Sequence, residues 1–255
     1  MAIGSAQRIV SLVPSTTESV CALGALDRVV ACTRYCTEPE PALRHVTRVG
    51  GTKNPDRQAI ASLDPDLLLV NAEENRPEDV EWLSARFPTL VQTPRSVVEA
   101  GNDLRVLATR LGLLEQAEPF LLRIEAQIAA AEVAALTRPP LQVYYAIWSI
   151  PWMTINRDTF IHDVLRLCGA TCVAADDPAR YPHMDPIEAV VRGVDLVLLA
   201  SEPWEFDEAQ RQQIAAAKLF GDAKVALCDG RDFCWHGVRM ADGLGRALAA
   251  IRGAL

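Results

Sequence analysis

Cysteine and histidine have the richest chemistry among the residues of this chain, and their spacing limits what they can do. Two pairs of cysteines, Cys32/Cys36 and Cys168/Cys172, are separated by three residues, whereas zinc knuckles and thioredoxin-like sites use a separation of two. The four histidines are scattered, at His45, His162, His183 and His236. No pair of them has the local spacing of metal ligands. The spacing therefore predicts neither a zinc knuckle nor a thioredoxin-like motif.

Catalytic motifs are also absent from the sequence. There is no GxxxxGK[ST], no HExxH and no GxSxG, and Gly243 and Gly245 lack the third glycine of a dinucleotide fingerprint. No nucleophile–base pair and no carboxylate pair stands at motif spacing. These absences argue against an enzyme.

Aromatic side chains are concentrated in the second half of the chain. Eleven of the fifteen Phe, Trp and Tyr residues follow residue 139. Several come just after predicted strands or in a nearby loop: Trp148, Trp152, Tyr181, Trp204 and Trp235. Ligands of parallel α/β sheets bind beyond the carboxyl ends of the strands, and flat rings favour flat, partly apolar ligands through stacking. The placement predicts a ligand of that kind.

The first half places polar residues at similar positions. Arg34 and Tyr35 follow the predicted strand Val29–Cys32, and a tight loop at Gly50–Pro55 carries Lys53. Basic residues in or near loops are candidates to meet carboxylates of a ligand: Arg34, Lys53, Arg180 and Arg239.

A free metal ion is the alternative ligand. Imidazole, carboxylate and thiolate together would suit zinc or another late first-row ion. The candidates for such a set are Cys36, His183, Glu202 and His236. Because they lie far apart in the chain, only the fold could bring them together.

Alternating strand and helix patterns predict an α/β chain. The predicted strands are Arg8–Val13, Val29–Cys32, Leu67–Val70, Leu90–Gln92, Leu141–Ile147, Val194–Ala200 and Lys224–Cys228. Two helices, Val97–Leu111 and Glu118–Leu136, lie in the middle. Ser15 and Glu18 fit a capping box for a helix that should end at Gly24.

The two halves resemble each other. Asp56 and Asp66 enclose a helix that leads into DLLLV, and Asp185 and Asp195 enclose one that leads into DLVLL. Two interpretations are open: the general similarity of βα units, or two similar lobes joined by the long helix. The second predicts lobes at residues 1–96 and 141–255, a helical connection at 97–140, and a ligand cleft between the lobes.

Composition excludes several classes of protein. The 255 residues are 50% hydrophobic and 23% charged, which is ordinary for a globular chain, and the net charge of -8 argues against general nucleic-acid binding. No stretch reaches the roughly 18 apolar residues of a membrane span. The first residues lack the charged and apolar regions of a signal peptide, so composition by itself favours an intracellular protein with reduced cysteines.

Longer stretches carry a family resemblance. They are RIVSLVPSTTESVCALGALDRVVACTRYC, VGGTKNPDRQAIASLDPDLLLV, YYAIWSIPWMTINRDTFIHDVLRLCGA, DLVLLASEPWEF and CDGRDFCWHGVRMADGL. Together, over roughly Arg8 to Leu248, they resemble the helical-backbone (class III) substrate-binding proteins of ABC importers. These include cobalamin, haem and ferric-siderophore binders and the helical backbone metal receptors. The resemblance implies two Rossmann-like α/β lobes with parallel sheets, joined by a single long helix, with ligand held between the lobes.

The resemblance also implies roles for particular residues. It implies ligand contacts by Ser15, Thr16, Arg34, Tyr35, Gly51, Thr52, Lys53, Trp148, Tyr181, Trp204, Trp235 and His236. It implies docking on a permease by Glu78 and by Glu205 or Glu208. One departure from the pattern is the pair Gly50-Gly51, where cobalamin binders often have an aromatic residue.

The expected partners are a metal chelate and an ABC permease dimer. The chelate is cobalamin or a related corrinoid, haem or a ferric siderophore. The resemblance implies a binding protein, not an enzyme, without a covalent cofactor. It also implies a monomer in the periplasm, without a membrane span. An intracellular corrinoid- or chelate-handling protein on the same fold is a further alternative.

Overall fold

The computed structural model describes residues 5–135 and 140–254, which form two compact units. The first lobe consists of the described residues up to Pro94 together with Val98–Leu122 and His236–Arg239. The second lobe consists of Arg95–Val97, the described residues from Arg123 to Trp235, and those from Met240 onward. Each lobe has its own parallel sheet, so the predicted fold class is confirmed.

The sheet of the first lobe has five parallel strands in the order β3-β2-β1-β6-β7. The strands are β1 (Ile9–Ser11), β2 (Val29–Cys32), β3 (Thr47–Arg48), β6 (Leu67–Asn71) and β7 (Thr89–Gln92). A small antiparallel hairpin pairs β4 (Gly50–Gly51) with β5 (Asn54–Pro55), and two 3-10 turns, η1 (Leu26–Arg28) and η2 (Ala42–His45), complete the connections. The four strands predicted in this half are all found, and each predicted end lies within two residues of the observed one.

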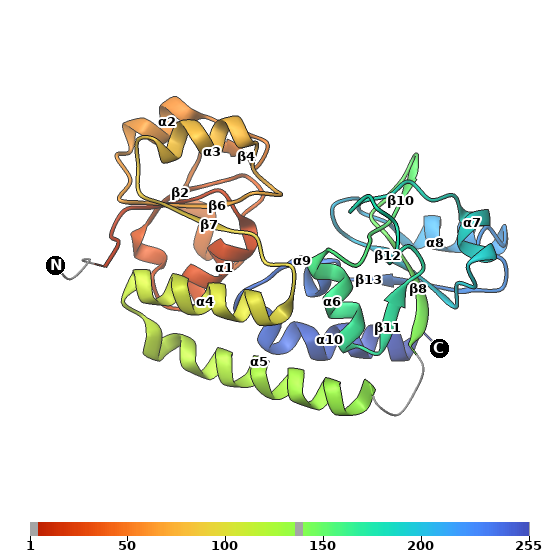
Figure 1. Cartoon of the computed structure of the whole chain (residues 1–255). Helices are drawn as coiled ribbons and strands as arrows, with labels where there is room; N and C mark the ends of the chain where they lie inside the picture. Colours follow the sequence, from red (N-terminus) through yellow and green to blue (C-terminus); the bar gives the residue numbers. More distant parts are fainter. Residues whose placement is uncertain (1–4, 136–139, 255) are drawn as a thin grey trace. The chain divides into compact units, whose positions relative to one another are not determined.

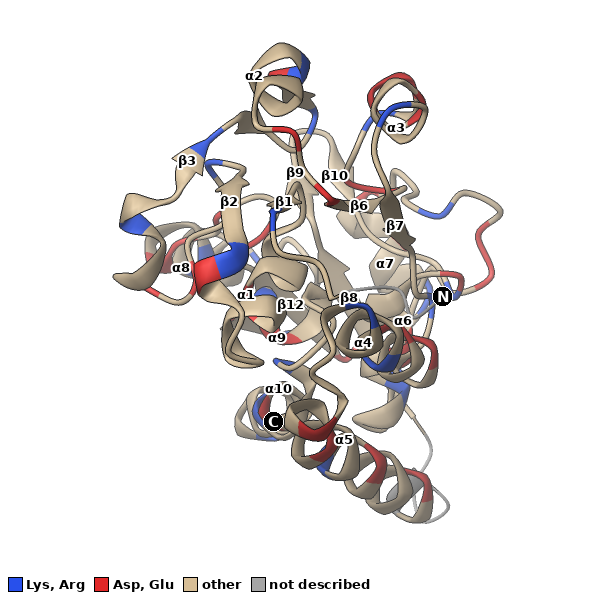
Figure 2. Cartoon of the chain, turned by 90° about the vertical axis from the view of Figure 1, so that its left-hand side faces the viewer, with Lys and Arg blue, Asp and Glu red and all other residues tan. Residues whose placement is uncertain are grey.

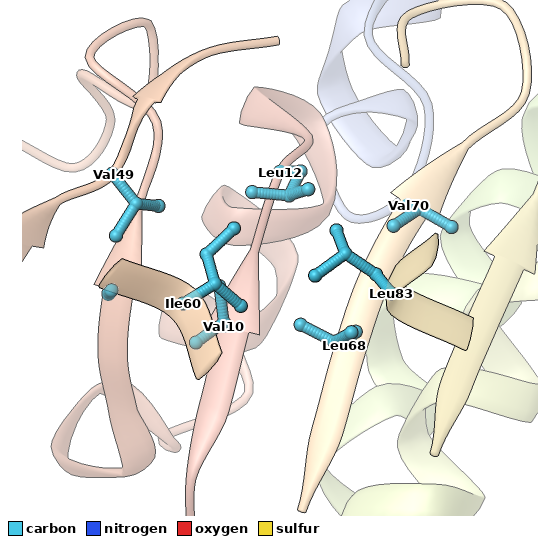
Figure 3. Close-up of a cluster of buried hydrophobic side chains, with 8 residues drawn as sticks. Val10, Leu12, Val49, Ile60, Leu68, Val70 and Leu83 are labelled. Carbon is cyan, nitrogen blue, oxygen red and sulfur yellow. The ribbon is translucent and has the colours of Figure 1, made fainter. Parts of the chain in front are cut away.

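Helices cover both faces of this sheet (Figure 1). Helices α2 (Arg57–Ser62) and α3 (Pro77–Ser84) lie on one face, and α1 (Pro14–Ala22) and α4 (Val97–Leu111) lie on the other. Figure 3 shows Ile60 of α2 and Leu83 of α3 packed against Val10 and Leu68 of the central strands. The alternate residues of the same strands are equally buried, which explains why DLLLV is continuously apolar.

The sheet of the second lobe has four parallel strands in the order β11-β8-β12-β13. The strands are β8 (Leu141–Ala146), β11 (Ala170–Cys172), β12 (Leu196–Ala200) and β13 (Lys224–Cys228), with a hairpin of β9 (Trp148–Ser149) and β10 (Trp152–Met153). The helices are α6 (Phe160–Leu167), α7 (Pro186–Val191), α8 (Glu208–Ala216), α9 (Arg231–Cys234) and α10 (Met240–Gly253).

The long helix is α5 (Leu114–Ala135), which is in the first lobe through Leu122 and in the second from Arg123. It begins four residues before the predicted Glu118, so Pro119 lies inside the helix, where it removes one backbone hydrogen bond. The predicted last residue, Leu136, lies outside the described residues.

Paired aspartates give the two lobes the same framework. The side chain of Asp56 accepts backbone N–H groups at the start of α2, and Asp185 does the same for α7. Asp66 accepts the N–H groups of Gln7 and Arg8 at the start of β1, at 2.8 and 2.9 Å. Asp195 accepts the N–H of Gln142 in β8 at 2.8 Å. The sequence similarity of the halves therefore reflects equivalent hydrogen bonds.

The capping box predicted at Ser15 is wrong. Helix α1 starts at Pro14, so its N-cap is Val13, which makes no side-chain cap. The fixed φ of proline suits the first helical position and moves the start forward. Ser15 and Glu18 are thereby inside the helix, where the segment His236–Arg239 supplies their partners. The predicted helix end is confirmed, because Gly24 has a φ of +89°.

Candidate functional site

In each lobe the strand order reverses beside the first strand of the sheet. This position is the switch point of the sheet, and it is where parallel sheets bind ligands. In the first lobe this point lies between β1 and β6, and in the second it lies between β8 and β12. In each lobe by itself, the residues at and just after the ends of these strands are candidates for ligand contacts. They are Leu12–Ser15 and Asn71–Asn75 in the first lobe, and Ile147–Trp148 and Ser201–Trp204 in the second.

Asn75 holds the loops of the first lobe together. Its amide group donates to the carbonyl oxygens of Leu12 at 3.2 Å and Thr52 at 3.0 Å. Its side-chain oxygen accepts the N–H of Asn71 at 2.8 Å. Three loops are thereby fixed by one buried side chain. This role was not predicted from the sequence, although an asparagine four residues after another at the end of an apolar strand is a signal for such a turn.

Arg34, Tyr35 and Gly51, predicted as ligand contacts, are brought together. The Arg34 N–H donates to the Gly50 carbonyl at 2.8 Å, and its guanidinium donates to Asn54 at 3.2 Å. The same guanidinium lies 5.6 Å from the centre of the Tyr35 ring. A Cβ on Gly51 would lie 3.2 Å from that ring, so only glycine leaves the ring its present position. Tyr35 is 55% exposed and free to meet a ligand.

Lys53 and Thr52 lie in the same hairpin. The Lys53 ammonium donates to the carbonyl of Glu73, and the Thr52 carbonyl accepts from Asn75. Both predicted residues are thus attached to the loop that follows β6.

Ser15, Thr16 and His236 are buried. Ser15 Oγ lies 3.3 Å from His236 Nε2, and the carboxylate of Glu18 pairs with Arg239 at 2.8 and 2.9 Å. Burial lowers the pKa of His236 to about 4, so the ring is neutral at pH 7. The structure brings Ser15 and His236 together as partners of each other.

Two tryptophans meet at the switch point of the second lobe. The rings of Trp148 and Trp204 are 4.6 Å apart at an angle of 64°, an edge-to-face contact. Trp148 donates its indole N–H to the Ile150 carbonyl at 3.0 Å. Within the described part of the chain, the buried indole N–H of Trp204 has no hydrogen-bond partner. Both residues are only partly buried, so ring surface remains available.

Tyr181 belongs to a loop that runs beside the β9–β10 hairpin, where Met153 pairs with His183. The backbone N–H of Thr154 donates to the Pro182 carbonyl at 3.0 Å, and the backbone N–H of Met184 donates to the Trp152 carbonyl at 3.2 Å. Tyr181 is 39% exposed, and the Arg180 guanidinium lies 5.8 Å from its ring. By contrast, Trp152 stacks with Phe206 and meets the edges of Tyr144 and Phe220, so it belongs to an aromatic core.

Trp235 differs from the other predicted aromatic contacts. It is 6% exposed and donates its indole N–H to Glu202 at 2.8 Å. Burial raises the pKa of the Glu202 carboxyl, and the hydrogen bond from Trp235 opposes that shift. Trp235 thus positions Glu202 and presents little surface of its own.

The structure gives the free-metal alternative no ligand set. Among residues 5–135 and 140–254, no three His, Cys, Asp or Glu side chains are grouped so that they could hold a metal ion. His183 is exposed, and His236 lies against Ser15.

The acidic residues expected to dock on a permease are exposed. Glu78 lies in the first turn of α3, which is acidic in Figure 2, and Glu205 lies in the loop after β12. Glu208 starts α8, but its carboxylate already accepts hydrogen bonds from Arg211 at 2.6 and 2.7 Å. The geometry favours Glu205 over Glu208 for an external partner.

Two lobes, each built on a parallel sheet, are the architecture of the two-lobe α/β class of binding proteins. A family model described as "Periplasmic binding protein" matches residues 9–217, and the chain belongs to that family. The expectation of a binding protein, not an enzyme, is confirmed by this family.

Similar proteins have known ligands. The chain is 25% identical over 194 residues to the vitamin B12-binding protein of Photorhabdus laumondii, covering 76% of this chain and 70% of that one. It matches the structure of the periplasmic vitamin B12 binding protein BtuF of Vibrio cholerae with a TM-score of 0.81 at 20% identity, over 98% of both chains. It matches the periplasmic heme-binding protein RhuT of Roseiflexus sp. RS-1 with a TM-score of 0.80 at 23% identity, over 98% and 99%.

A helix that spans a membrane must be both long and apolar. Within residues 5–135 and 140–254, no helix is long and apolar enough to cross a bilayer.

Proposed function

We propose that this protein binds a metal chelate and delivers it to an ABC importer. The chelate is cobalamin or a related corrinoid, haem or a ferric siderophore. The observation that carries the proposal is the contact of Trp148 with Trp204 at the switch point of the second lobe. Rings that are half-buried yet fixed lose little entropy when they stack on a flat ligand.

The first lobe complements these rings with polar groups. Arg34 and Lys53 are cations in loops that Asn75 and the β4–β5 hairpin hold in place. Cations so placed suit the carboxylates, amides or phosphate that surround the metal in such chelates. The vitamin B12- and heme-binding relatives support a ligand of this class.

Titration of the purified protein tests the proposal. Cyanocobalamin, haemin and a ferric hydroxamate are added separately while tryptophan fluorescence is recorded, and calorimetry gives an independent reading for coloured ligands. We expect saturable one-to-one binding of one class, with a Kd of about 1 μM or below. Cobalt and ferric salts alone are the controls and should not bind. Absence of binding by all three chelates would refute the proposal.

We propose further that a periplasmic monomer docks on the permease through Glu78 and Glu205. The carboxylates of Glu78 and Glu205 are exposed and have no hydrogen-bond or ion-pair partner among the described residues, so they are available to meet basic residues of a partner. Glu205→Gln should lower uptake in a reconstituted transporter, and Glu208→Gln is the matched control because Arg211 already holds that carboxylate. Equal uptake by the Glu205 and Glu208 variants would contradict this assignment. Ligand affinity should stay unchanged in both.

A further inference from the structure

Cys32 and Cys36 form a pair of thiols that the binding function does not use. Cys32 is the last residue of β2, and Cys36 closes the turn that follows, with its N–H donating to the Thr33 carbonyl at 3.2 Å. Both side chains are 0% exposed. A strand end and a tight turn thus place two cysteines together at a fixed position.

Polar donors surround both sulfur atoms. Arg48 pairs with Cys32 across the β2–β3 ladder, and its Nη1 lies 2.8 Å from Cys32 Sγ. The same nitrogen lies 2.8 Å from the Cys36 carbonyl, so one guanidinium holds both ends of the turn. The hydroxyls of Thr17 and Thr33 lie 3.1 and 3.2 Å from Cys36 Sγ. Donors of this kind stabilise a thiolate.

The two thiols are not equivalent. A hydrogen bond from Cys32, with those from Thr17 and Thr33, lowers the pKa of Cys36, although burial opposes the shift. The same hydrogen bond, with burial, raises the pKa of Cys32. One sulfur is therefore suited to attack an oxidant and the other to attack the product.

The second lobe contains the same spacing without the same surroundings. Cys168 follows α6 and Cys172 ends β11, with Gly169 between them at a φ of +77°. Burial raises the pKa of Cys168 to about 12 and also raises that of Cys172. The Sγ of Cys168 lies 4.0 Å from the Leu244 carbonyl, and that of Cys172 lies 3.4 Å from the hydroxyl of Thr154. The two cysteines point to different neighbours.

We propose that Cys32 and Cys36 are a redox-active pair that an oxidant of the hydroperoxide class converts to a disulfide. A small oxidant is required because both thiols are buried. The Cys36 thiolate attacks one peroxide oxygen, the O–O bond breaks, and hydroxide leaves to give a sulfenic acid. Cys32 then loses its proton and attacks the Cys36 sulfur, so that an S–S bond forms and the S–O bond breaks to release water. Two thiols and one hydrogen peroxide give one disulfide and two waters, because the two thiol protons neutralise the two hydroxides; an alkyl hydroperoxide would give one alcohol and one water.

Mass spectrometry of the full-length protein tests the pair independently of any ligand. The protein is reduced, freed of reductant, treated with hydrogen peroxide, unfolded and alkylated. We expect two of the seven thiols to be lost. Trypsin cleaves after Arg34, so the disulfide should join peptides 29–34 and 35–44. The pair Cys168/Cys172 lies within one tryptic peptide, 167–180, which should remain doubly alkylated.

Single-residue variants distinguish the roles of the two sulfur atoms. Cys32→Ser should stop at a sulfenic acid on Cys36, trapped by dimedone, and Cys36→Ser should leave Cys32 as a thiol. Cys172→Ser is the matched control and should form the 29–34/35–44 link like the unmodified sequence. Disulfide formation by Cys168/Cys172 at the same rate, a link to Cys21, or retention of all seven thiols would each overturn the proposal.

Discussion

The two lobes share a framework but differ in what that framework presents. Asp56 and Asp185 cap the helices before β6 and β12. Asp66 binds the backbone just before β1, and Asp195 binds the backbone near the start of β8. Beyond the strand ends the similarity stops. The first lobe has polar loops held by Asn75, whereas the second has tryptophan and tyrosine rings. A repeated framework can therefore carry different side chains beyond the strand ends of the two lobes.

The difference also separates two ways of fixing a side chain. Hydrogen bonds hold the loops of the first lobe, and ring packing holds the hairpin of the second. Hydrogen bonds fix direction, whereas ring contacts tolerate small shifts. We therefore expect the first lobe to determine which ligand groups are accepted, and the second to supply most of the affinity.

The largest expected effect distinguishes a tryptophan that stabilises the second lobe from one that is proposed to bind the ligand. Trp152→Ala should lower the free energy of unfolding by about 3 kcal/mol, because Trp152 packs on Phe206 and Phe220. Trp204→Ala should change stability little but weaken chelate binding about 10- to 100-fold. Urea denaturation and ligand titration measure the two quantities. If Trp204→Ala instead unfolds the protein without a separate loss of affinity, the second lobe has no such division.

A histidine should make stability depend on pH. The unfolded ring takes a proton near pH 6.5, whereas the pKa of buried His236 is lowered to about 4. This ring therefore leaves the free energy of unfolding nearly unchanged above about pH 6.5. As the pH falls toward 4 the free energy of unfolding falls too, by about 2 kcal/mol at pH 5, because the unfolded state takes up a proton that the folded state does not. Denaturation of His236→Gln between pH 7 and 5 should show a shallower fall, and the exposed His45→Gln is the control.

Part of the pH dependence should remain in that variant. Burial also lowers the pKa of His162 in the second lobe. A double variant, His162→Gln with His236→Gln, should flatten the profile further. Parallel profiles for the unmodified and His236→Gln proteins would show that His236 is not held neutral by burial.

Much of the fold could be predicted from local pattern. Apolar runs bounded by Asp, Gly and Pro marked β1, β2, β6 and β12 closely, because both faces of these strands are largely buried. The two-residue strands were missed because so short a run has no periodicity. The start of α1 was misplaced because the partners of Ser15 and Glu18 lie more than 200 residues away, at His236 and Arg239.

The candidate site could be predicted only by residue type and position. Aromatic residues after strands pointed to Trp148 and Trp204, which the structure places in contact. Trp235 looks the same in sequence, but it is buried against Glu202, a contact that chain order does not reveal. The same limit applies to the two CxxxC pairs. Their spacing is identical, and only the fold sets Cys32 against Arg48.

Removal of the matched aspartates should show whether the shared framework contributes equally in both lobes. Asp66→Ala should cost about 1 to 2 kcal/mol of stability, since it accepts two backbone N–H groups, and Asp195→Ala about 1 kcal/mol. Asp222→Ala is the control, because the ion pair of Asp222 with Lys218 is exposed and should contribute little to stability. Thermal or urea unfolding measures all three. No loss in Asp195→Ala would mean that the repeat is one of sequence alone.

The smallest effect should come from adding one methyl group in the first lobe. It tests whether ligand affinity can change while stability does not. In Gly51→Ala the new Cβ would meet Asn54 Oδ1 at 2.5 Å, Arg34 Nη2 at 3.1 Å and the Tyr35 ring at 3.2 Å. These are ends of flexible side chains that can move aside, so stability should change little. Ligand affinity should fall about three- to tenfold, because the displaced groups are the proposed contacts.

The neighbouring glycine provides the contrast. Gly50 has a φ of +93°, and its Cβ would lie 2.5 Å from the backbone oxygen of Asn54, which cannot move aside alone. Gly50→Ala should therefore lower stability. Gly101→Ala, with nothing within 4 Å of the new Cβ, should leave affinity unchanged and stabilise α4 by about 0.5 to 1 kcal/mol. If Gly51→Ala binds the chelate as tightly as Gly101→Ala, the Arg34–Tyr35 loop is not part of the site, and affinity resides in the second lobe alone.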